Sequence, residues 1–354
     1  MEALLPLRFT GFSVLVLDQR LLPREDKYTE YFDLEGLYDS IRSMELRGAP
    51  LIGIATAYAM FLGVKNRSFP NQAVLLETVK KNAERLNQAR PTAKNLFWAT
   101  ARLVRLVERN IGLRVDEIID RMRAEAVRIN EEDVEICRSI GEHFLTVLKP
   151  GMRLLTHCNA GALATYRYGT ATAPMYLGQE RGWNFRVFVD ETRPYNQGAR
   201  LTAYELHRAG IDATLICDNM AAMVMSKGWV DAILVGSDRV AANGDAANKI
   251  GTLNLSILAR HFGIPFYVAT PTPTLDLELP DGNHIPIEER DGEEITHFLG
   301  VRVAPEGIKV FNPAFDVSPH ENITGIVTEK GIAYPPFELS LKALAEKTGP
   351  SGNG

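Results

Sequence analysis

Several polar, glycine-containing stretches follow apolar segments and carry residue types suited to acid–base chemistry and anion binding. The first, Thr156 to Ala162 (THCNAGA), places Cys158 on an expected loop at the end of a strand. Backbone amides there, with the amino end of a following helix, could lower the thiol pKa and bind an anion. The alternative is that Cys158 is a small apolar side chain packed under the loop, as free cysteines often are.

The second stretch, Val230 to Leu253, begins with the apolar run Ala232 to Val235, which predicts a buried parallel strand. Asp238 follows this run and is a natural acid or base, whose pKa we expect burial beside a thiol to raise. Asn248 and Lys249 are expected at the start of the next helix, able to donate to a phosphate or enolate oxygen. The alternative is an ordinary loop with a capping acid.

A third stretch, DETRPYNQGAR, gathers two acids, two arginines and amides where a strand should lead into a helix. Arg193 could hold an acid or a phosphate as a planar fork, and Gln197 could donate to a sugar hydroxyl or phosphate. The alternative is a helix cap with surface charges.

Two further arginines stand at expected helix boundaries in the first half of the chain. Arg47 precedes Gly48, which would let the backbone approach a ligand closely, and Arg90 precedes a proline and a threonine. Each arginine alone is more often a surface charge, but together they supply cations for a phosphate.

Composition narrows the class of protein. The 354 residues suffice for two domains, and a net charge of -5 argues against nucleic-acid binding. No apolar run reaches the roughly 20 residues that cross a bilayer, and the amino end lacks a secretory leader, so we expect a cytoplasmic protein without membrane contact. The three cysteines indicate neither a disulfide framework nor a zinc site. Dinucleotide, P-loop and serine-hydrolase motifs are absent from the sequence, so we expect no cofactor. The histidines do not pair as H-x-x-x-H and no Cys/His cluster has zinc spacing, so we expect no metal.

The hydrophobic periodicity divides the chain at about residue 148. We expect a strand or hairpin and an α-helical domain over 1–148, and a Rossmann-like α/β domain with a mostly parallel sheet over 149–354. The expected helices of the first domain cover 34–44, 51–64, 72–88, 93–109, 115–142 and 144–148. The expected strands of the second cover 153–157, 186–189, 213–217, 232–235, 266–269 and 309–311. Its expected helices cover 169–179, 198–208, 221–226, 248–261 and 338–347, before a polar tail that should be disordered.

Motifs spread along almost the whole chain resemble those of the methylthioribose-1-phosphate isomerases, a family shared with the regulatory subunits of the eukaryotic translation-initiation exchange factor. They are LDQRLLP, RGAPLIGIATAYAM, RPTAKNLFWA, THCNAGALAT, DETRPYNQGARLTAYEL, GSDRVAANGDAANKIGT and AFDVSPHENITGIVTEKG. The resemblance implies a helical domain on a Rossmann-like domain, usually as a homodimer, with a small sugar phosphate as its partner.

The same resemblance implies a site and a reaction. The family's thiol falls on Cys158 and its catalytic acid on Asp238. The substrate contacts it implies are Arg47, Gly48, Ala49, Arg90, Gln197, Asn248 and Lys249. The implied enzyme is an aldose–ketose isomerase that converts 5-methylthioribose 1-phosphate to 5-methylthioribulose 1-phosphate in methionine salvage. The alternatives are a ribose-1,5-bisphosphate isomerase and a non-catalytic exchange-factor subunit, and 5-deoxyribose 1-phosphate stays open as a further substrate.

Overall fold

The computed structural model describes residues 4–90 and 94–347, which fall into two compact units. The helical unit comprises residues 4–135 and 162–169, and the sheet unit comprises 136–161 and 170–347. The expected break at Pro91 and Thr92 and the expected disordered tail lie outside the described residues. None of the described helices combines the length and apolarity that a membrane crossing requires.

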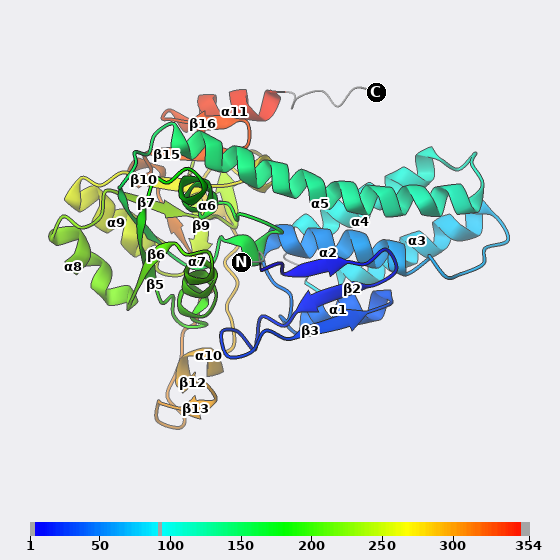
Figure 1. Cartoon of the computed structure of the whole chain (residues 1–354), viewed down its shortest axis with the longest axis horizontal. Coiled ribbons are helices and arrows are strands. Elements are labelled where there is room, and N and C mark those ends of the chain that lie inside the picture. The colour runs from blue at the N-terminus through cyan, green and yellow to red at the C-terminus, as the bar shows by residue number, and fades with distance from the viewer. Residues whose placement is uncertain (1–3, 91–93, 348–354) are drawn as a thin grey trace. The chain divides into compact units, whose positions relative to one another are not determined.

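The helical unit begins with a small antiparallel sheet and continues as helices (Figure 1). Its strands, in the order β1-β2-β3, are β1 (Leu7–Phe9), β2 (Val14–Leu17) and β3 (Tyr28–Tyr31). Its helices are α1 (Leu34–Arg42), α2 (Ala49–Leu62), α3 (Gln72–Asn87), α4 (Lys94–Arg109) and the first two thirds of α5 (Val115–Leu145). The expected break within the last of these is wrong, because α5 runs on without interruption to Leu145. Gly141 lies inside α5, where an added Cβ would lie 2.7 Å from Cδ1 of Leu177.

The apolar helix α2 forms the centre of the helical unit. Every residue from Leu51 to Leu62 is buried, as its uniformly apolar sequence predicts. Pro50 lies in the first turn, where its missing N–H costs nothing, and Gly48 is the N-cap. The core around α2 includes residues from all the other helices of this unit.

The sheet unit is built on seven strands in the order β16-β15-β10-β7-β4-β5-β6. Only β16 runs antiparallel to its neighbour, so the expected α/β class with a mostly parallel sheet is confirmed. The strands are β4 (Arg153–Thr156), β5 (Arg186–Asp190), β6 (Asp212–Ile216), β7 (Ala232–Val235), β10 (Phe266–Ala269), β15 (Gly325–Thr328) and β16 (Gly331–Ala333). The α-helices wholly within this unit are α6 (Ala173–Glu180), α7 (Ala203–Arg208), α8 (Ala221–Ser226), α9 (Thr252–Phe262), α10 (Glu293–Thr296) and α11 (Phe337–Glu346).

Two expectations for the sheet unit are wrong. Residues 309–311 form no strand, and β15 takes the place beside β10 instead. Asn248 and Lys249 do not begin a helix but end strand β9 (Ala246–Lys249). This strand pairs with β8 (Arg239–Ala241) and with β14 (Phe315–Ser318) in a second sheet that also contains β11 (Leu275–Asp276). All four residues of β9 are buried, and the sheet supplies the backbone partners that they need.

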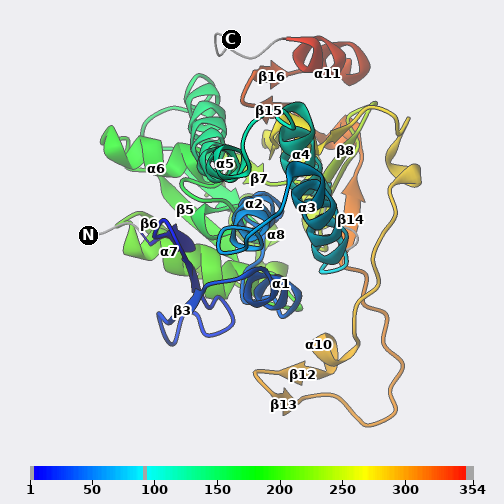
Figure 2. The ribbon, with the colours of Figure 1, turned by 90° about the vertical axis from the view of Figure 1, so that its right-hand side faces the viewer.

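The polar segment between β10 and β14 holds a small hairpin. Strands β12 (His297–Phe298) and β13 (Val301–Arg302) pair antiparallel after α10. Both views of the chain show α10, β12 and β13 standing away from the seven strands of their own unit (Figures 1 and 2).

Candidate active site

The strand order of the sheet unit places Cys158 and Asp238 at one edge of the sheet. Cys158 follows β4 and Asp238 follows β7, and these two strands pair in parallel with Leu155 opposite Ile233. The chain adds β5 and β6 on one side of β4 and then returns to add β7 on the other. The carboxyl edge between β4 and β7 is therefore the topological switch point, where open α/β sheets bind ligands.

Cys158 has an unusual backbone and a half-buried side chain. Its φ angle is 63°, in the left-handed region that residues other than glycine seldom occupy. Its amide donates to Oγ1 of Thr192 at 2.8 Å, and its carbonyl oxygen accepts from Oγ1 of Thr202 at 2.6 Å. Cys137, by contrast, is buried within α5. Cys158 is thus held at a strand end with its thiol partly accessible.

Asp238 is not buried, contrary to the sequence prediction. Its side chain is exposed, although the strand before it is wholly buried. Its amide donates to the carbonyl oxygen of Ala247 at 2.9 Å, which ties this residue to β9. Sequence pattern could not show the exposure, because Asp238 lies beyond the end of β7 in the loop that leads to the second sheet.

The end of β9 brings a cation and an amide to the same region of the sheet unit. Asn248 is buried and donates from Nδ2 to Oγ1 of Thr252 at 3.0 Å. Lys249 is also buried, and its Nζ lies 4.6 Å from the centre of the Phe315 ring, within the range of a cation–π contact. A buried ammonium of this kind is pre-positioned to attract an anion.

Gln197 lies buried just before a π-helical turn, η2 (Gly198–Thr202), that leads into α7. Among the described residues, its Oε1 atom has no hydrogen-bond partner, and neither has Oδ1 of the adjacent Asn196. Buried acceptors without partners are costly unless another group donates to them. These two oxygens are thus buried acceptors to which no described residue donates.

A buried pair, His157 and Asp190, connects the Cys158 loop to the end of β9. Nε2 of His157 lies 2.9 Å from the carbonyl oxygen of Ile250, so this nitrogen must carry a proton and donate it. Nδ1 lies 3.0 Å from Oδ2 of Asp190, so one further proton lies between the two side chains. Burial raises the pKa of Asp190 to about 6, although the hydrogen bond and charge of His157 oppose this. Burial lowers the pKa of His157, but the carboxylates of Asp190 and Asp218 outweigh it and raise that pKa.

The engagement of both ring nitrogens bears on what His157 can do. It is therefore not available as a base for Cys158, although the two residues are adjacent in the sequence. The ring also packs on Gly251, where an added Cβ would lie 2.9 Å from its Cε1 atom. Sequence reasoning missed this pair, and its one signal was a histidine next to the candidate thiol at a strand end.

Two groups of described residues have side-chain atoms close enough to share a metal ion, and their hydrogen bonds argue against that use. In the first, His157 and Asp190 are bonded as above, and Asp218 accepts from the amides of Thr192 and Arg193 at 2.7 Å each. The second group comprises Asp245, His320 and Glu321. Asp245 accepts there from the amides of Gly282 and His320, which fixes a turn.

The four remaining site residues of the sequence prediction lie in the helical unit. Arg47 is buried, whereas Gly48, Ala49 and Arg90 are half-buried. Gly48 has a φ angle of 101°, and an added Cβ would lie 2.5 Å from the Cα atom of Ala164. Only glycine fits this position, because the backbone of Ala164 lies so close. The predicted close approach of Gly48 to a ligand stays a prediction.

Arg193 has a role other than the predicted grip on a phosphate. Its guanidinium donates to the carbonyl oxygen of Pro194 at 2.7 Å and to those of Glu294 and Ile295 at 3.3 and 3.2 Å. The arginine thus fastens the excursion that carries α10 to the end of β5. The carbonyl groups of Glu294 and Ile295 lie about a hundred residues later in the chain, so the sequence around Arg193 could not predict these hydrogen bonds.

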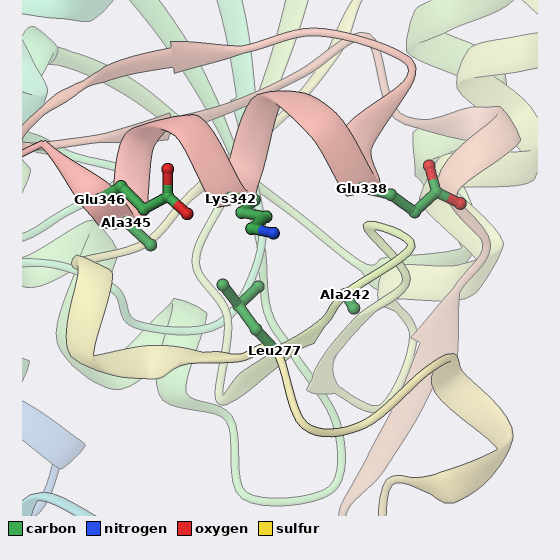
Figure 3. Close-up of a pocket in the computed structure, with 6 residues that line it drawn as sticks. All are labelled: Ala242, Leu277, Glu338, Lys342, Ala345 and Glu346. Carbon is green, nitrogen blue, oxygen red and sulfur yellow. The ribbon is translucent and has the colours of Figure 1, made fainter.

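A cavity of about 370 Å³ lies elsewhere in the sheet unit, between α11 and the turn after β8 (Figure 3). Lys342 reaches toward Leu277, and Glu338 and Glu346 lie on either side of it along the helix. Two carboxylates around one ammonium repel a phosphate, so this cavity does not compete with the switch point as a site for an anion.

Comparisons with known proteins agree on the kind of molecule. The sequence model of the Initiation factor 2 subunit family matches residues 45–335. A protein of Clostridium botulinum (strain Kyoto / Type A2) named 5-deoxyribose 1-phosphate isomerase is 56% identical over 95% of this chain and 96% of its own length. A protein of the same name from Bacillus thuringiensis is 54% identical over 97% and 99%.

Solved structures show the same fold. The 5-methylthioribose 1-phosphate isomerase of Pyrococcus horikoshii superposes with a TM-score of 0.94 at 43% identity, covering 98% of this chain and 97% of that one. The structure described as translation initiation factor eIF-2B, subunit delta, from A. fulgidus superposes with a TM-score of 0.90 at 40% identity, over 98% and 100% of the two chains.

Proposed function

Since this chain belongs to the Initiation factor 2 subunit family and is a sugar-phosphate isomerase of that family, we propose that it converts 5-deoxyribose 1-phosphate to 5-deoxyribulose 1-phosphate. Two relatives at 54% and 56% identity that bear the name 5-deoxyribose 1-phosphate isomerase support this choice of substrate. A cytoplasmic homodimer, as the family resemblance implies, is part of the proposal.

The observation that carries the proposal is the placement of Cys158 and Asp238 at the switch point between β4 and β7. An aldose 1-phosphate cannot open its ring spontaneously, because the phosphate occupies the anomeric oxygen. The enzyme must therefore protonate the ring oxygen, and a carboxylic acid is suited to that donation. In this proposal Asp238 is the acid, and substrate binding supplies the dry surroundings that its exposed side chain lacks.

After ring opening, a hydrogen must move from C2 to C1. Cys158 is proposed as the base that takes the C2 proton, which gives an enediol phosphorylated on its C1 oxygen, and the thiol then donates a proton to C1. As C2 becomes the ketone, its hydroxyl proton returns to the carboxylate of Asp238, which restores the acid. Lys249 and the amides of the Cys158 loop would hold the negative charge that develops on the oxygens. Direct transfer of a hydride from C2 to C1 is the competing route, in which exclusion of water matters more than thiolate basicity.

The remaining residues that the family resemblance implies are proposed as substrate contacts. They are Arg47, Gly48, Ala49, Arg90, Gln197, Asn248 and Lys249. The carbonyl oxygen of Gln197 has no hydrogen-bond partner among the described residues and can accept from a sugar hydroxyl.

5-Methylthioribose 1-phosphate is the second candidate substrate, favoured by the Pyrococcus horikoshii isomerase at 43% identity. It differs from 5-deoxyribose 1-phosphate only at C5, where a thiomethyl group replaces a hydrogen. The chemistry at C1 and C2 is the same for both, so the site described above serves either sugar. What separates them is the apolar space around C5.

Initial rates with the purified protein on three sugar phosphates test the proposal. We expect turnover of 5-deoxyribose 1-phosphate and 5-methylthioribose 1-phosphate, and little or none of ribose 1,5-bisphosphate, whose second phosphate needs further cations. A clear preference for the bisphosphate would overturn the substrate assignment. Tight binding of all three without turnover would instead support a non-catalytic regulatory subunit.

A further inference from the structure

The backbone of Cys158 is fixed by two threonine hydroxyl groups from different parts of the sheet unit. Thr192, after β5, accepts the amide proton of Cys158 at 2.8 Å, and Thr202, at the end of η2, donates to its carbonyl oxygen at 2.6 Å. Both threonines are buried, and each residue is at most 1% exposed. From this geometry we propose that Thr192 and Thr202 form a clamp that positions the thiol for the isomerase reaction, an inference that rests on the proposed function.

The clamp acts on a conformation that the chain would not keep unaided. With φ at 63°, Cys158 is left-handed, and a return to the common right-handed region would swing its Cα–Cβ bond and carry the sulfur away. Conformations of this kind persist only where surrounding groups hold them, and they cluster at functional sites. Bonds to both the amide and the carbonyl oxygen of one residue restrain the peptide planes on either side of it.

The direction of each hydroxyl proton is also determined. Oγ1 of Thr192 donates to the carbonyl oxygen of Asp190 at 3.1 Å, which leaves its lone pairs for the Cys158 amide. Oγ1 of Thr202 accepts from Nδ2 of Asn159 at 3.0 Å, which directs its proton to the Cys158 carbonyl oxygen. Each hydroxyl therefore has one donor and one acceptor role, and neither can exchange them without breaking a bond.

Thr192 is itself held by the neighbouring strand. Its φ angle is 65°, which a β-branched residue rarely adopts, and its amide donates to Asp218 at 2.7 Å. Asp218 follows β6, Thr192 follows β5 and Cys158 follows β4, and these three strands are adjacent in the sheet. The hydrogen bonds of the clamp thus connect Cys158 to the ends of three neighbouring strands, which restrains the position of its thiol.

Substitutions that remove or keep each hydroxyl test the clamp. Valine has the shape of threonine without the hydroxyl, and serine keeps the hydroxyl. We expect Thr192→Val and Thr202→Val to lower kcat on 5-deoxyribose 1-phosphate about 100-fold with KM unchanged, since small misplacements of a reacting group cost about that much. Thr192→Ser and Thr202→Ser should retain the wild-type kcat. Unchanged kcat in both valine variants, with only a lower melting temperature, would overturn the clamp.

A second readout separates the clamp from the proposed function. The rate at which iodoacetamide alkylates Cys158 is measured against pH in a Cys217→Ser background, because Cys217 is the other half-buried thiol. We expect the valine variants to shift this profile and the serine variants to leave it in place. If the wild type turns over no sugar phosphate but the valine variants shift the profile, the proposed function fails and the clamp stands. Identical profiles in all variants would refute the clamp whatever the activity.

Discussion

Asp133 in α5 is a buried acid that should make the helical unit less stable as pH rises. Burial raises its pKa from the ordinary value of 3.8 to about 7, although the amide of Tyr166, which donates to its Oδ2 at 2.9 Å, acts to lower it. The folded protein therefore binds this proton more tightly than the unfolded chain does. The protonated carboxyl therefore contributes to the free energy of unfolding. This contribution is fully present below about pH 4 and is lost as pH rises through about 7.

The size of the effect follows from the shift. One pKa unit corresponds to about 1 kcal/mol, so stability should fall by about 1 kcal/mol between pH 6 and pH 8 through this group alone. Asp133→Asn keeps a carbonyl oxygen for the Tyr166 amide but cannot ionise. The variant should therefore gain stability relative to the wild type by about that amount over the same interval. The change matters for function because Tyr166 belongs to the segment 162–169, on which Gly48 packs through Ala164.

Urea denaturation of the wild type and Asp133→Asn at pH 6, 7 and 8 measures the difference. Asp231→Asn is the matched control, since the hydrogen bonds and charge of Arg153 lower the pKa of Asp231 and its contribution stays constant in this range. A difference between Asp133→Asn and the wild type that does not change from pH 6 to pH 8 would refute the reasoning. A change of opposite sign would refute it as well.

Three further predictions concern the reaction and the glycine of the helical unit. Cys158→Ser and Asp238→Asn should each abolish turnover while calorimetry still detects substrate binding, and near-normal turnover in either variant would remove that residue's proposed role. Reaction in deuterated water should place solvent deuterium at C1 of the product, because the proton on the half-buried Cys158 thiol can exchange with solvent before a proton is donated to C1. Complete absence of deuterium by mass spectrometry would favour the hydride route. Gly48→Ala should destabilise the protein by about 2 kcal/mol or more through its clash with Ala164. Gly11→Ala is the control in melting experiments, because Gly11 has the same positive φ in open space, and equal losses in both variants would show that no clash occurs.

Sequence reasoning succeeded where the signal was local. Strands β7 and β10 and helix α8 were predicted to the residue, because the side chains of a short buried strand or helix form its own apolar pattern. The α/β class followed from the alternation of such elements. Cys158 and Asp238 could be placed at strand ends for the same reason, although their use as site residues remains a prediction.

The sequence was uninformative where structure depends on distant partners. The residues of β9 read as the start of a helix, and they form a strand only because β14, some seventy residues later in the chain, pairs with them. The left-handed conformation of Cys158 likewise depends on hydroxyl groups at positions 192 and 202. The residues around Arg193 suggested an anion-binding arginine. Its guanidinium instead donates to carbonyl oxygens about a hundred residues later in the chain.

The central claim is that the chain isomerises an aldose 1-phosphate to a ketose 1-phosphate at the switch point that carries Cys158 and Asp238. ¹³C NMR of 5-deoxyribose 1-phosphate labelled at C1 tests it directly. With the wild type we predict that the anomeric signal gives way to that of a CH₂ group still coupled to phosphorus, and with Asp238→Asn that the anomeric signal persists. An unchanged signal with the wild type, or loss of the phosphorus coupling through release of phosphate, would contradict the account.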